Sequence, residues 1–333
     1  MDKEGKSGFV LKDNFGRQIN YLRLAVTDRC NLRCSYCMPE EGILSIPHKE
    51  ILSYEECLRL INIFSALGIN KLRITGGEPF VRKGLINFIE SVRKSSLYLS
   101  ILITTNGTLI FPYLRKLKDF GISGINLSLD TLNKEKFRII TQRDNLSDVL
   151  RTLKEITKLQ IPLKINTVVS NDFNIDEIND LAGIAKNKNI EVRFIEKMPF
   201  DGKSSEVNFI SAKKLYEILK SLYPGMTRID ENNSTANLFS IPGFIGKIGI
   251  IESYTRSFCS TCNRIRITPN GILKTCLYDN GVLDLREMLR ANYSDDDIKE
   301  AVINCVNKRF VNGFAVEASS KIQVKNSMAA IGG

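Results

Sequence analysis

Three cysteines, Cys30, Cys34 and Cys37, lie within eight positions of the chain, with the spacing C-x3-C-x2-C. Three thiolates in one loop can bind three irons of a four-iron cluster and leave the fourth iron open to a small molecule, because protein-held clusters usually take four cysteines. A zinc site made from this loop alone would also lack a ligand, since structural zinc prefers four. The chain has only 8 cysteines in 333 residues, so chance clustering is a poor explanation. The spacing therefore favours an iron–sulfur cluster over zinc.

A second set of three cysteines follows in the last third of the chain, in the run Cys259-Ser-Thr-Cys262 and at Cys276. If the intervening residues form a strand, Arg264 and Arg266 point to the same face, beside the metal. Guanidinium groups suit phosphate, carboxylate or the acceptor edge of a purine. The alternatives are a zinc knuckle whose fourth ligand comes from elsewhere, or a strand with ordinary salt bridges.

Length and composition limit the classes of protein that remain. A chain of 333 residues predicts about two domains, or one large α/β barrel with an extension. The net charge of +10 suits a nucleic acid or a small polyanionic substrate, but the basic residues are dispersed and there is no Trp to stack on bases. No apolar stretch reaches the length of a membrane span, and the charged N-terminus does not resemble a signal peptide. We therefore expect a cytoplasmic protein that binds neither nucleic acid nor membrane.

Short β-rich runs alternate with amphipathic runs from residue 20 to about 225, which predicts parallel strands joined by helical crossovers. The expected strands are Tyr21–Thr27, Lys71–Thr75, Leu99–Thr104, Gly124–Leu129, Leu163–Val169 and Ile190–Ile195, and the expected helices are Ser53–Leu67, Leu85–Lys94, Tyr113–Phe120, Leu146–Leu159 and Asp176–Asn187. Six such units predict an α/β fold with a partial (β/α)6 TIM-like barrel over residues 1–230. An open doubly wound sheet is the alternative.

The polar string at residues 230–235 marks a boundary, after which residues 231–333 are expected to form a smaller α+β domain. Its expected strands are Leu238–Ile241, Lys247–Ile251, Arg264–Thr268 and Ile272–Thr275, and its helical runs are Leu283–Arg290 and Asp295–Lys308.

Polar motifs stand at the ends of several expected strands, where functional residues gather in parallel α/β folds. These motifs are Thr75-Gly-Gly-Glu-Pro79, Thr104-Thr-Asn-Gly107 and Ser128-Leu-Asp130, and Cys30 follows the first strand. Paired glycines allow a ligand to approach the backbone closely. Together these motifs predict a site at the same edge of the sheet as the first three cysteines.

The cysteine loop followed by Gly-Gly-Glu-Pro resembles the radical S-adenosylmethionine (SAM) superfamily. Within it, the chain resembles the GTP 3′,8-cyclase family from about Gly16 to Gly333. The specific signals are the run Arg23-Leu-Ala-Val-Thr-Asp-Arg-Cys30, the run Arg193-Phe-Ile-Glu-Lys-Met198, the second cysteine set with Asn-Arg-x-Arg, and the terminal Ile331-Gly-Gly333.

The resemblance implies two 4Fe–4S clusters as cofactors, one on Cys30, Cys34 and Cys37 and the other on Cys259, Cys262 and Cys276. It implies that SAM contacts Tyr36, Gly77, Ser128 and Met198. It further implies that GTP contacts Arg23, Arg73, Thr104, Lys164, Arg264 and Arg266, the last two beside the guanine. The Gly332-Gly333 tail is expected to thread into the cavity.

The implied reaction converts GTP to 3′,8-cyclo-7,8-dihydro-GTP, the first step of molybdenum cofactor biosynthesis, while SAM is cleaved to 5′-deoxyadenosine and methionine. Arg23 is the implied catalytic residue, in the later reduction of the purine radical. The implied partners are an unidentified electron donor, the next enzyme of the pathway (cyclic pyranopterin monophosphate synthase) and a second copy in a homodimer.

Two alternatives to a GTP 3′,8-cyclase remain. One is a radical SAM enzyme whose second cluster serves a peptide substrate, and the other is a zinc-containing nucleic-acid-binding module. The chain also departs from the family pattern at Lys197, where an apolar residue is common, and at Lys308-Arg309, which replaces a common Lys-Pro and is not followed by the usual histidine.

Overall fold

The computed structural model describes residues 8–38, 45–198, 209–230, 234–319 and 331. The Gly332-Gly333 tail, which was expected to thread into the cavity, is not among the described residues. Among the residues described, no helix is long and apolar enough to cross a membrane.

Twelve strands of the described residues form one sheet, and its centre is parallel. The six parallel strands in sequence order are β1 (Tyr21–Ala25), β2 (Lys71–Thr75), β3 (Ser100–Thr105), β4 (Gly124–Ser128), β5 (Leu163–Val169) and β6 (Ile190–Glu196). Each pairs with the next one along the chain. This order confirms the expected α/β fold with a mostly parallel sheet.

The last third of the chain extends this sheet at both edges. Strand β10 (Arg264–Ile267) pairs in parallel with β1, and β9 (Lys247–Ile251) pairs in parallel with β6. Antiparallel strands then complete the two edges: β11 (Ile272–Lys274) and β12 (Leu283–Asp284) beyond β10, and β8 (Asn237–Ser240) and β7 (Thr227–Ile229) beyond β9. Residues 231–333 thus contribute strands to the same sheet as residues 1–230.

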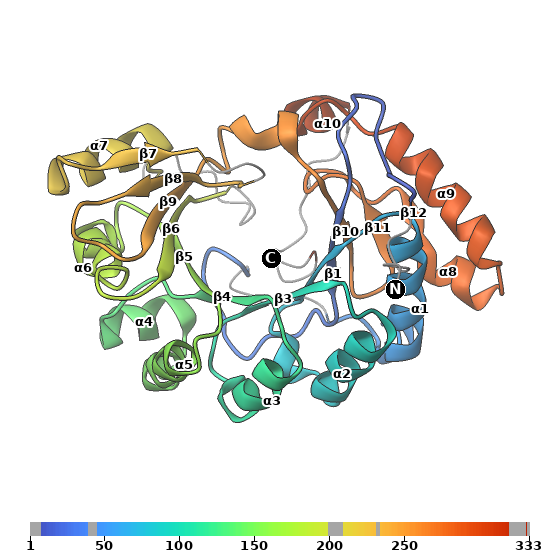
Figure 1. Cartoon of the computed structure of the whole chain (residues 1–333), viewed down its shortest axis with the longest axis horizontal. Coiled ribbons are helices and arrows are strands. Elements are labelled where there is room, and N and C mark those ends of the chain that lie inside the picture. Colours follow the sequence, from blue (N-terminus) through green and yellow to red (C-terminus); the bar gives the residue numbers. More distant parts are fainter. Residues whose placement is uncertain (1–7, 39–44, 199–208, 231–233, 320–330, 332–333) are drawn as a thin grey trace, which may run out of the picture.

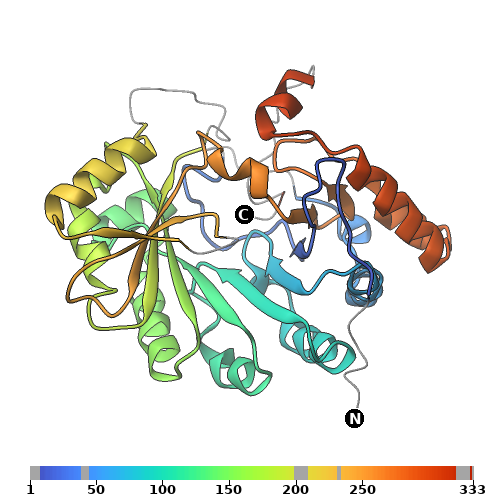
Figure 2. The same ribbon diagram turned by 45° about the horizontal axis from the view of Figure 1, so that its top comes forward.

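The helices from α1 to α9 lie outside the curved sheet and leave its inner face toward the centre of the molecule, and α10 lies at the rim (Figures 1 and 2). They are α1 (Tyr54–Ala66), α2 (Leu85–Ser95), α3 (Leu114–Asp119), α4 (Lys134–Thr141), α5 (Leu146–Lys158), α6 (Ile178–Gly183), α7 (Ala212–Leu222), α8 (Leu285–Arg290), α9 (Asp295–Asn307) and α10 (Gly313–Ser319). Helix α1 begins with a capping box, in which Ser53 Oγ accepts from Glu56 N at 3.1 Å and Glu56 Oε2 accepts from Ser53 N at 2.7 Å. These bonds satisfy backbone donors that the first turn leaves open.

Successive side chains along a strand alternate between the apolar core and a polar cavity on the other face of the sheet. In β5, Leu163, Ile165 and Val169 are buried in the core that the helices cover, while Lys164 and Asn166 are only partly buried and line a cavity on the other side. The period of two residues places successive side chains on opposite faces. The same pattern in neighbouring strands gives the sheet one apolar face and one polar face.

Most expected elements are confirmed to within two residues, and the differences are local. The expected helix Asp176–Asn187 is a 3-10 turn at Ile175–Glu177 followed by the short helix α6, and the run Leu283–Arg290 begins as strand β12. Helices α4, α7 and α10 and strand β7 were not expected.

Candidate active site

The first three cysteines lie in the loop that follows β1. Backbone bonds from the Cys37 and Met38 amides to the Cys34 carbonyl, at 2.9 and 3.0 Å, form a tight turn that keeps the thiols together. Cys30 Sγ accepts from Leu32 N at 3.4 Å and from Asn106 Nδ2 at 3.7 Å, and Asn106 follows β3. The end of a neighbouring strand thus helps to orient the loop.

Burial controls the acidity of these thiols. It raises the pKa of Cys30, and it raises the pKa of Cys34 further, with the Asp130 carboxylate adding to the effect. Thiols in this setting need a nearby metal cation to stay deprotonated, because a metal removes the proton from a coordinating thiol. Among the described residues, no three His, Cys, Asp or Glu side chains are arranged to hold a single metal ion. In a four-iron cluster each thiolate bonds a different iron, so the three sulfurs need not converge on one point.

The four predicted SAM contacts lie at the carboxyl ends of the strands. Tyr36 donates a hydrogen bond from its hydroxyl to Asp130 Oδ2 at 2.7 Å, and Ser128 is the last residue of β4. Gly77 N donates to the Thr27 carbonyl at 2.8 Å, and a Cβ at Gly77 would lie 2.5 Å from the Arg29 carbonyl oxygen. Only glycine therefore allows the turn after β2 to lie so close to the cysteine loop.

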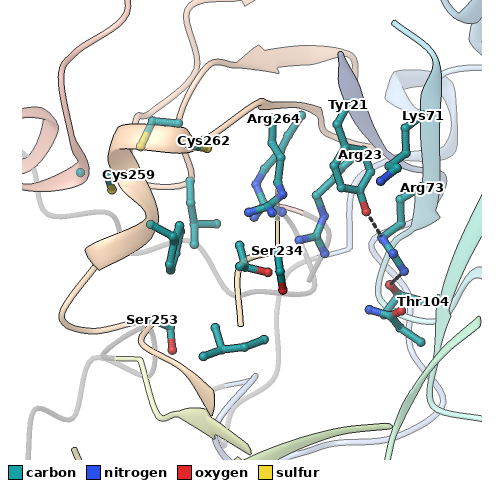
Figure 3. A pocket seen from close by; sticks show the side chains of 18 of the residues that line it. Tyr21, Arg23, Lys71, Arg73, Thr104, Ser234, Ser253, Cys259, Cys262 and Arg264 are labelled. Atoms are coloured by element: carbon teal, nitrogen blue, oxygen red, sulfur yellow. Dashed lines mark hydrogen bonds between the residues drawn. The ribbon is translucent and has the colours of Figure 1, made fainter. Parts of the chain in front are cut away.

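Two rows of polar side chains cross the three strands β2, β1 and β10. Their register pairs Lys71 with Tyr21 and Tyr21 with Arg264 in one row, and Arg73 with Arg23 and Arg23 with Arg266 in the next. Partners in register on parallel strands point to the same face. Six side chains from three distant segments thus line one wall, and the labelled members converge on one space in Figure 3.

Hydrogen bonds and ring contacts tie these rows together. Arg73 Nε donates to the Tyr21 hydroxyl, and its Nη1 donates to Thr104 Oγ1 at 3.3 Å. Burial alone would raise the pKa of Tyr21, but the charges of Arg73, Arg23 and Arg264 outweigh it and lower the pKa to about 8. The Tyr21 hydroxyl is therefore unusually acidic.

The wall continues across β4, β5 and β6 with one acidic partner. Asn126 is in register with Thr104 on one side and Lys164 on the other. Glu191 accepts a salt bridge from Lys164 Nζ at 2.7 Å and another from Arg193 Nε. Burial would raise the pKa of Glu191, but Arg193 and Lys164 lower it, so the carboxylate stays charged.

The second cysteine set lies opposite these strands, with two arginines against it. Arg17 Nη1 donates to the Cys259 carbonyl at 2.9 Å, and Arg309 donates from Nη1 to the Cys262 carbonyl at 3.0 Å and from Nη2 to Cys262 Sγ at 3.1 Å. Burial would raise the pKa of the Cys262 thiol, but Arg309 and Arg264 lower it. In contrast, burial raises the pKa of Cys276 to about 11.

The two rows of side chains and the second cysteine set share one cavity of about 640 Å³. Nine Lys and Arg side chains of the described residues line it, with no Asp or Glu among the described lining residues: Arg17, Arg23, Lys71, Arg73, Lys164, Arg193, Arg264, Arg266 and Arg309. Burial and Arg264 lower the pKa of Arg266 to about 10, and burial together with Arg266 lowers that of Arg23 well below its usual value. Like charges held this close in a buried site are costly, which is typical of a site built for an anion.

The cavity contains all six residues predicted to contact GTP, and also Met198 and the three cysteines of the second set. The cysteines of the first set and Tyr36, Gly77 and Ser128 are not among its lining residues. Sequence reasoning did not select several of the other lining residues, among them Arg17, Tyr21, Lys71, Arg193 and Arg309. Lys71 and Tyr21 could have been found, because each stands two residues before a predicted contact in the same strand.

Comparison with known proteins agrees with this arrangement. Residues 24–184 match the Radical SAM superfamily, and residues 190–313 match the family described as Molybdenum Cofactor Synthesis C. A GTP 3′,8-cyclase of Peptoclostridium acidaminophilum is 42% identical over 304 residues, which cover 90% of this chain and 92% of that protein. Molybdenum cofactor biosynthesis protein 1 of Dictyostelium discoideum is 41% identical over 90% of this chain, but the chain spans about half (49%) of that longer relative.

The parallel sheet, the cysteine loop and the match over residues 24–184 define a radical SAM protein. A solved structure of anSMEcpe with bound AdoMet shares the fold, with a TM-score of 0.60 and 18% identity over 91% of this chain and 84% of that one. The identity to the bacterial cyclase over nearly its whole length is more specific. The chain belongs to the GTP 3′,8-cyclase family.

Proposed function

We propose that the chain is a cytoplasmic GTP 3′,8-cyclase that converts GTP to 3′,8-cyclo-7,8-dihydro-GTP, the first step of molybdenum cofactor biosynthesis. The observation that carries this proposal is the cavity that the second cysteine set and nine cationic side chains line together. A nucleoside triphosphate is a compact polyanion with a purine, so it can offset the buried charges and present acceptor atoms to the cysteine end.

The first cysteine set supports a resident 4Fe–4S cluster and SAM. Its three thiols are half-buried, and two N–H groups donate to Cys30 Sγ. When bound, the cluster and SAM supply a 5′-deoxyadenosyl radical that abstracts a hydrogen atom from the substrate. We assign SAM to Tyr36, Gly77, Ser128 and Met198, with Asp130 fixing the Tyr36 hydroxyl.

The cavity wall suggests how the chain orients GTP. Arg264 and Arg266 adjoin the second cysteine set on β10, so they hold the guanine beside the cluster assigned to Cys259, Cys262 and Cys276. Arg73, Thr104 and Lys164 lie on β2, β3 and β5, where they bind the triphosphate, and we add Lys71 and Arg193 to this group. Arg23 is in register between Arg73 and Arg266, so it lies between the two ends of the substrate and can reach the reacting purine.

Three finer assignments belong to the same proposal. The central strands and their outer helices are interpreted as a (β/α)6 partial barrel over residues 1–230, with residues 231–333 as the C-terminal domain. We propose an electron donor of unidentified class, and the next pathway enzyme, cyclic pyranopterin monophosphate synthase, as partners. A homodimer is the proposed assembly.

The decisive experiment is anaerobic incubation of the reconstituted protein with SAM, dithionite and GTP deuterated at the ribose 3′ carbon. Mass spectrometry should find deuterium in 5′-deoxyadenosine and a nucleotide that is isomeric with GTP. Cys34→Ala should abolish 5′-deoxyadenosine, whereas Cys262→Ala should remove the nucleotide product. Formation of 5′-deoxyadenosine that is stimulated by peptides and not by GTP would instead favour the peptide-modifying alternative.

A further inference from the structure

Arg309 contacts the second cysteine set through two atoms of the same cysteine. Its Nη1 donates to the Cys262 carbonyl at 3.0 Å, and its Nη2 donates to Cys262 Sγ at 3.1 Å. A guanidinium is a planar fork, so two bonds to one residue fix both the position of that residue and the direction of its side chain. The Arg309 side chain is only 4% exposed, so solvent weakens these bonds little.

A buried carboxylate holds Arg309 in this orientation. Asp13 Oδ2 lies 3.6 Å from Arg309 Nη1 and 2.6 Å from Arg17 Nε, and its side chain is fully buried. Asp13 Oδ1 accepts from the backbone amides of Phe15 and Arg17, at 2.9 and 3.0 Å. The carboxylate is therefore rigid, and it anchors two guanidinium groups at once.

Arg17 holds the other end of the same cysteine pair. It donates to the Cys259 carbonyl at 2.9 Å and to the carbonyls of Phe310 and Val311, both at 2.7 Å, which follow Arg309 directly. Asp13, Arg17 and Arg309 thus form an arginine clasp around Cys259 and Cys262. The clasp joins residues near the start of the chain to a segment almost 300 residues later.

The charge of the clasp matters for electron transfer. Hydrogen bonds to a cysteine sulfur and nearby positive charge stabilise the reduced, more negative state of an iron–sulfur cluster. Asp13 is shared between two arginines, so one carboxylate faces two guanidinium charges and the clasp keeps a net positive charge beside Cys262.

We propose that Arg309 is a positioning residue for the second cysteine set, which holds Cys262 in its ligating direction and raises the reduction potential of the cluster bound there. This inference rests on the proposed function, because it requires an iron–sulfur cluster on Cys259, Cys262 and Cys276. The role is distinct from GTP binding, since both bonds end on the cysteine itself.

The test measures the midpoint potential of each cluster in the full-length, anaerobically reconstituted protein by potentiometric titration with electron paramagnetic resonance. Replacing the first or the second cysteine triplet by Ala assigns the two signals. In Arg309→Met the second cluster should become about tenfold harder to reduce, a fall of about 59 mV for one electron, while the potential of the first cluster stays unchanged. Arg309→Lys keeps the charge without the fork, so its potential should fall by less.

Arg290→Met is the matched control, because Arg290 is a partly exposed arginine whose contacts are with Glu56, Lys49 and Ile51. It should leave both potentials at their wild-type values. A wild-type potential for the second cluster in Arg309→Met would overturn the inference. If Arg309→Met loses the second cluster, Arg309→Lys decides: a lowered potential supports the inference, and a wild-type potential overturns it.

Failure of the inference and failure of the proposed function give different results. A wild-type protein with about four irons instead of about eight has no second cluster, and both then fail. A wild-type protein with both clusters, whose potentials do not respond to Arg309→Met, refutes only the inference.

Discussion

Arg266 provides a direct test of how the cavity works, because its charge should destabilise the empty protein and stabilise the complex with GTP. Burial and the neighbouring Arg264 lower the pKa of Arg266 from its usual 12.5 to about 10. A lowered pKa in a base means that folding disfavours the charged form, at every pH below about 10. One pKa unit corresponds to about 1.4 kcal/mol, so the charge costs the folded protein about 3 kcal/mol at neutral pH.

Arg266→Met removes this cost and keeps an unbranched apolar stem. The entropy of unfolding is about 2.1 cal/mol/K per residue, or about 0.7 kcal/mol/K for the whole chain, so the ligand-free protein should gain about 4 °C in melting temperature. GTP binding should weaken by about 10- to 100-fold, because hydrogen bonds to a charged group contribute about 1.5–3 kcal/mol. The stabilisation by GTP should shrink accordingly, since it depends on the ratio of ligand concentration to dissociation constant.

Anaerobic calorimetry with and without GTP measures both effects. Arg82→Met is the control, because Arg82 lies outside the cavity and donates to the Val26 and Leu52 carbonyls, both at 2.7 Å. That variant should lower the melting temperature and leave GTP affinity unchanged. If Arg266→Met melts several degrees lower and binds GTP as tightly as the wild type, Arg266 is a structural residue and the reasoning is wrong.

Three further predictions concern single groups around the site. Tyr21 should titrate near pH 8, seen as tyrosinate absorbance that rises between about pH 7 and 9 and is absent in Tyr21→Phe; a transition only above pH 10 would contradict it. Gly77→Ala should destabilise the protein by about 1–3 kcal/mol and lower its SAM affinity, because the new Cβ would lie 2.5 Å from the Arg29 carbonyl oxygen. Gly183→Ala is the control, because its Cβ would enter open space and should leave stability unchanged. Burial raises the pKa of Glu78 from 4.5 to about 7, so the free energy of unfolding should decline by about 3 kcal/mol as the pH rises from about 4.5 through 7. Urea titrations at several pH values should show this decline in the wild type and not in Glu78→Gln. The same pH dependence in both proteins would refute the prediction.

The positions of the strands could be predicted from the sequence better than the pairing of one strand with another. Lys71–Thr75, Leu163–Val169 and Lys247–Ile251 match the structure at both ends, because each is a β-branched or apolar run bounded by polar residues or turns. The pairing of β10 with β1 could not be predicted in the same way. It joins residues about 240 positions apart, and local residue preferences do not specify such contacts.

In the candidate site, too, local patterns in the sequence indicate some residues, while others depend on contacts between distant segments. Residue type and spacing were enough to select the cysteines and the Arg-x-Arg pair of β10. The period of two residues could also have indicated Lys71 and Tyr21, but that they form one row with Arg264 follows only from the register of the three strands. Arg309 is different, since it follows helix α9, and no local pattern indicates that its side chain reaches Cys262.

The parallel pairing of β1 with β10 also has a consequence during synthesis. Until residue 267 has left the ribosome, one edge of β1 has no partner, and an open edge strand invites pairing with another chain. Arg23 at the centre of β1 is a charge that discourages such pairing on a strand whose other residues are buried. The same arginine that faces the proposed substrate in the finished protein is therefore also expected to discourage aggregation of the nascent chain while its partner strand is still untranslated.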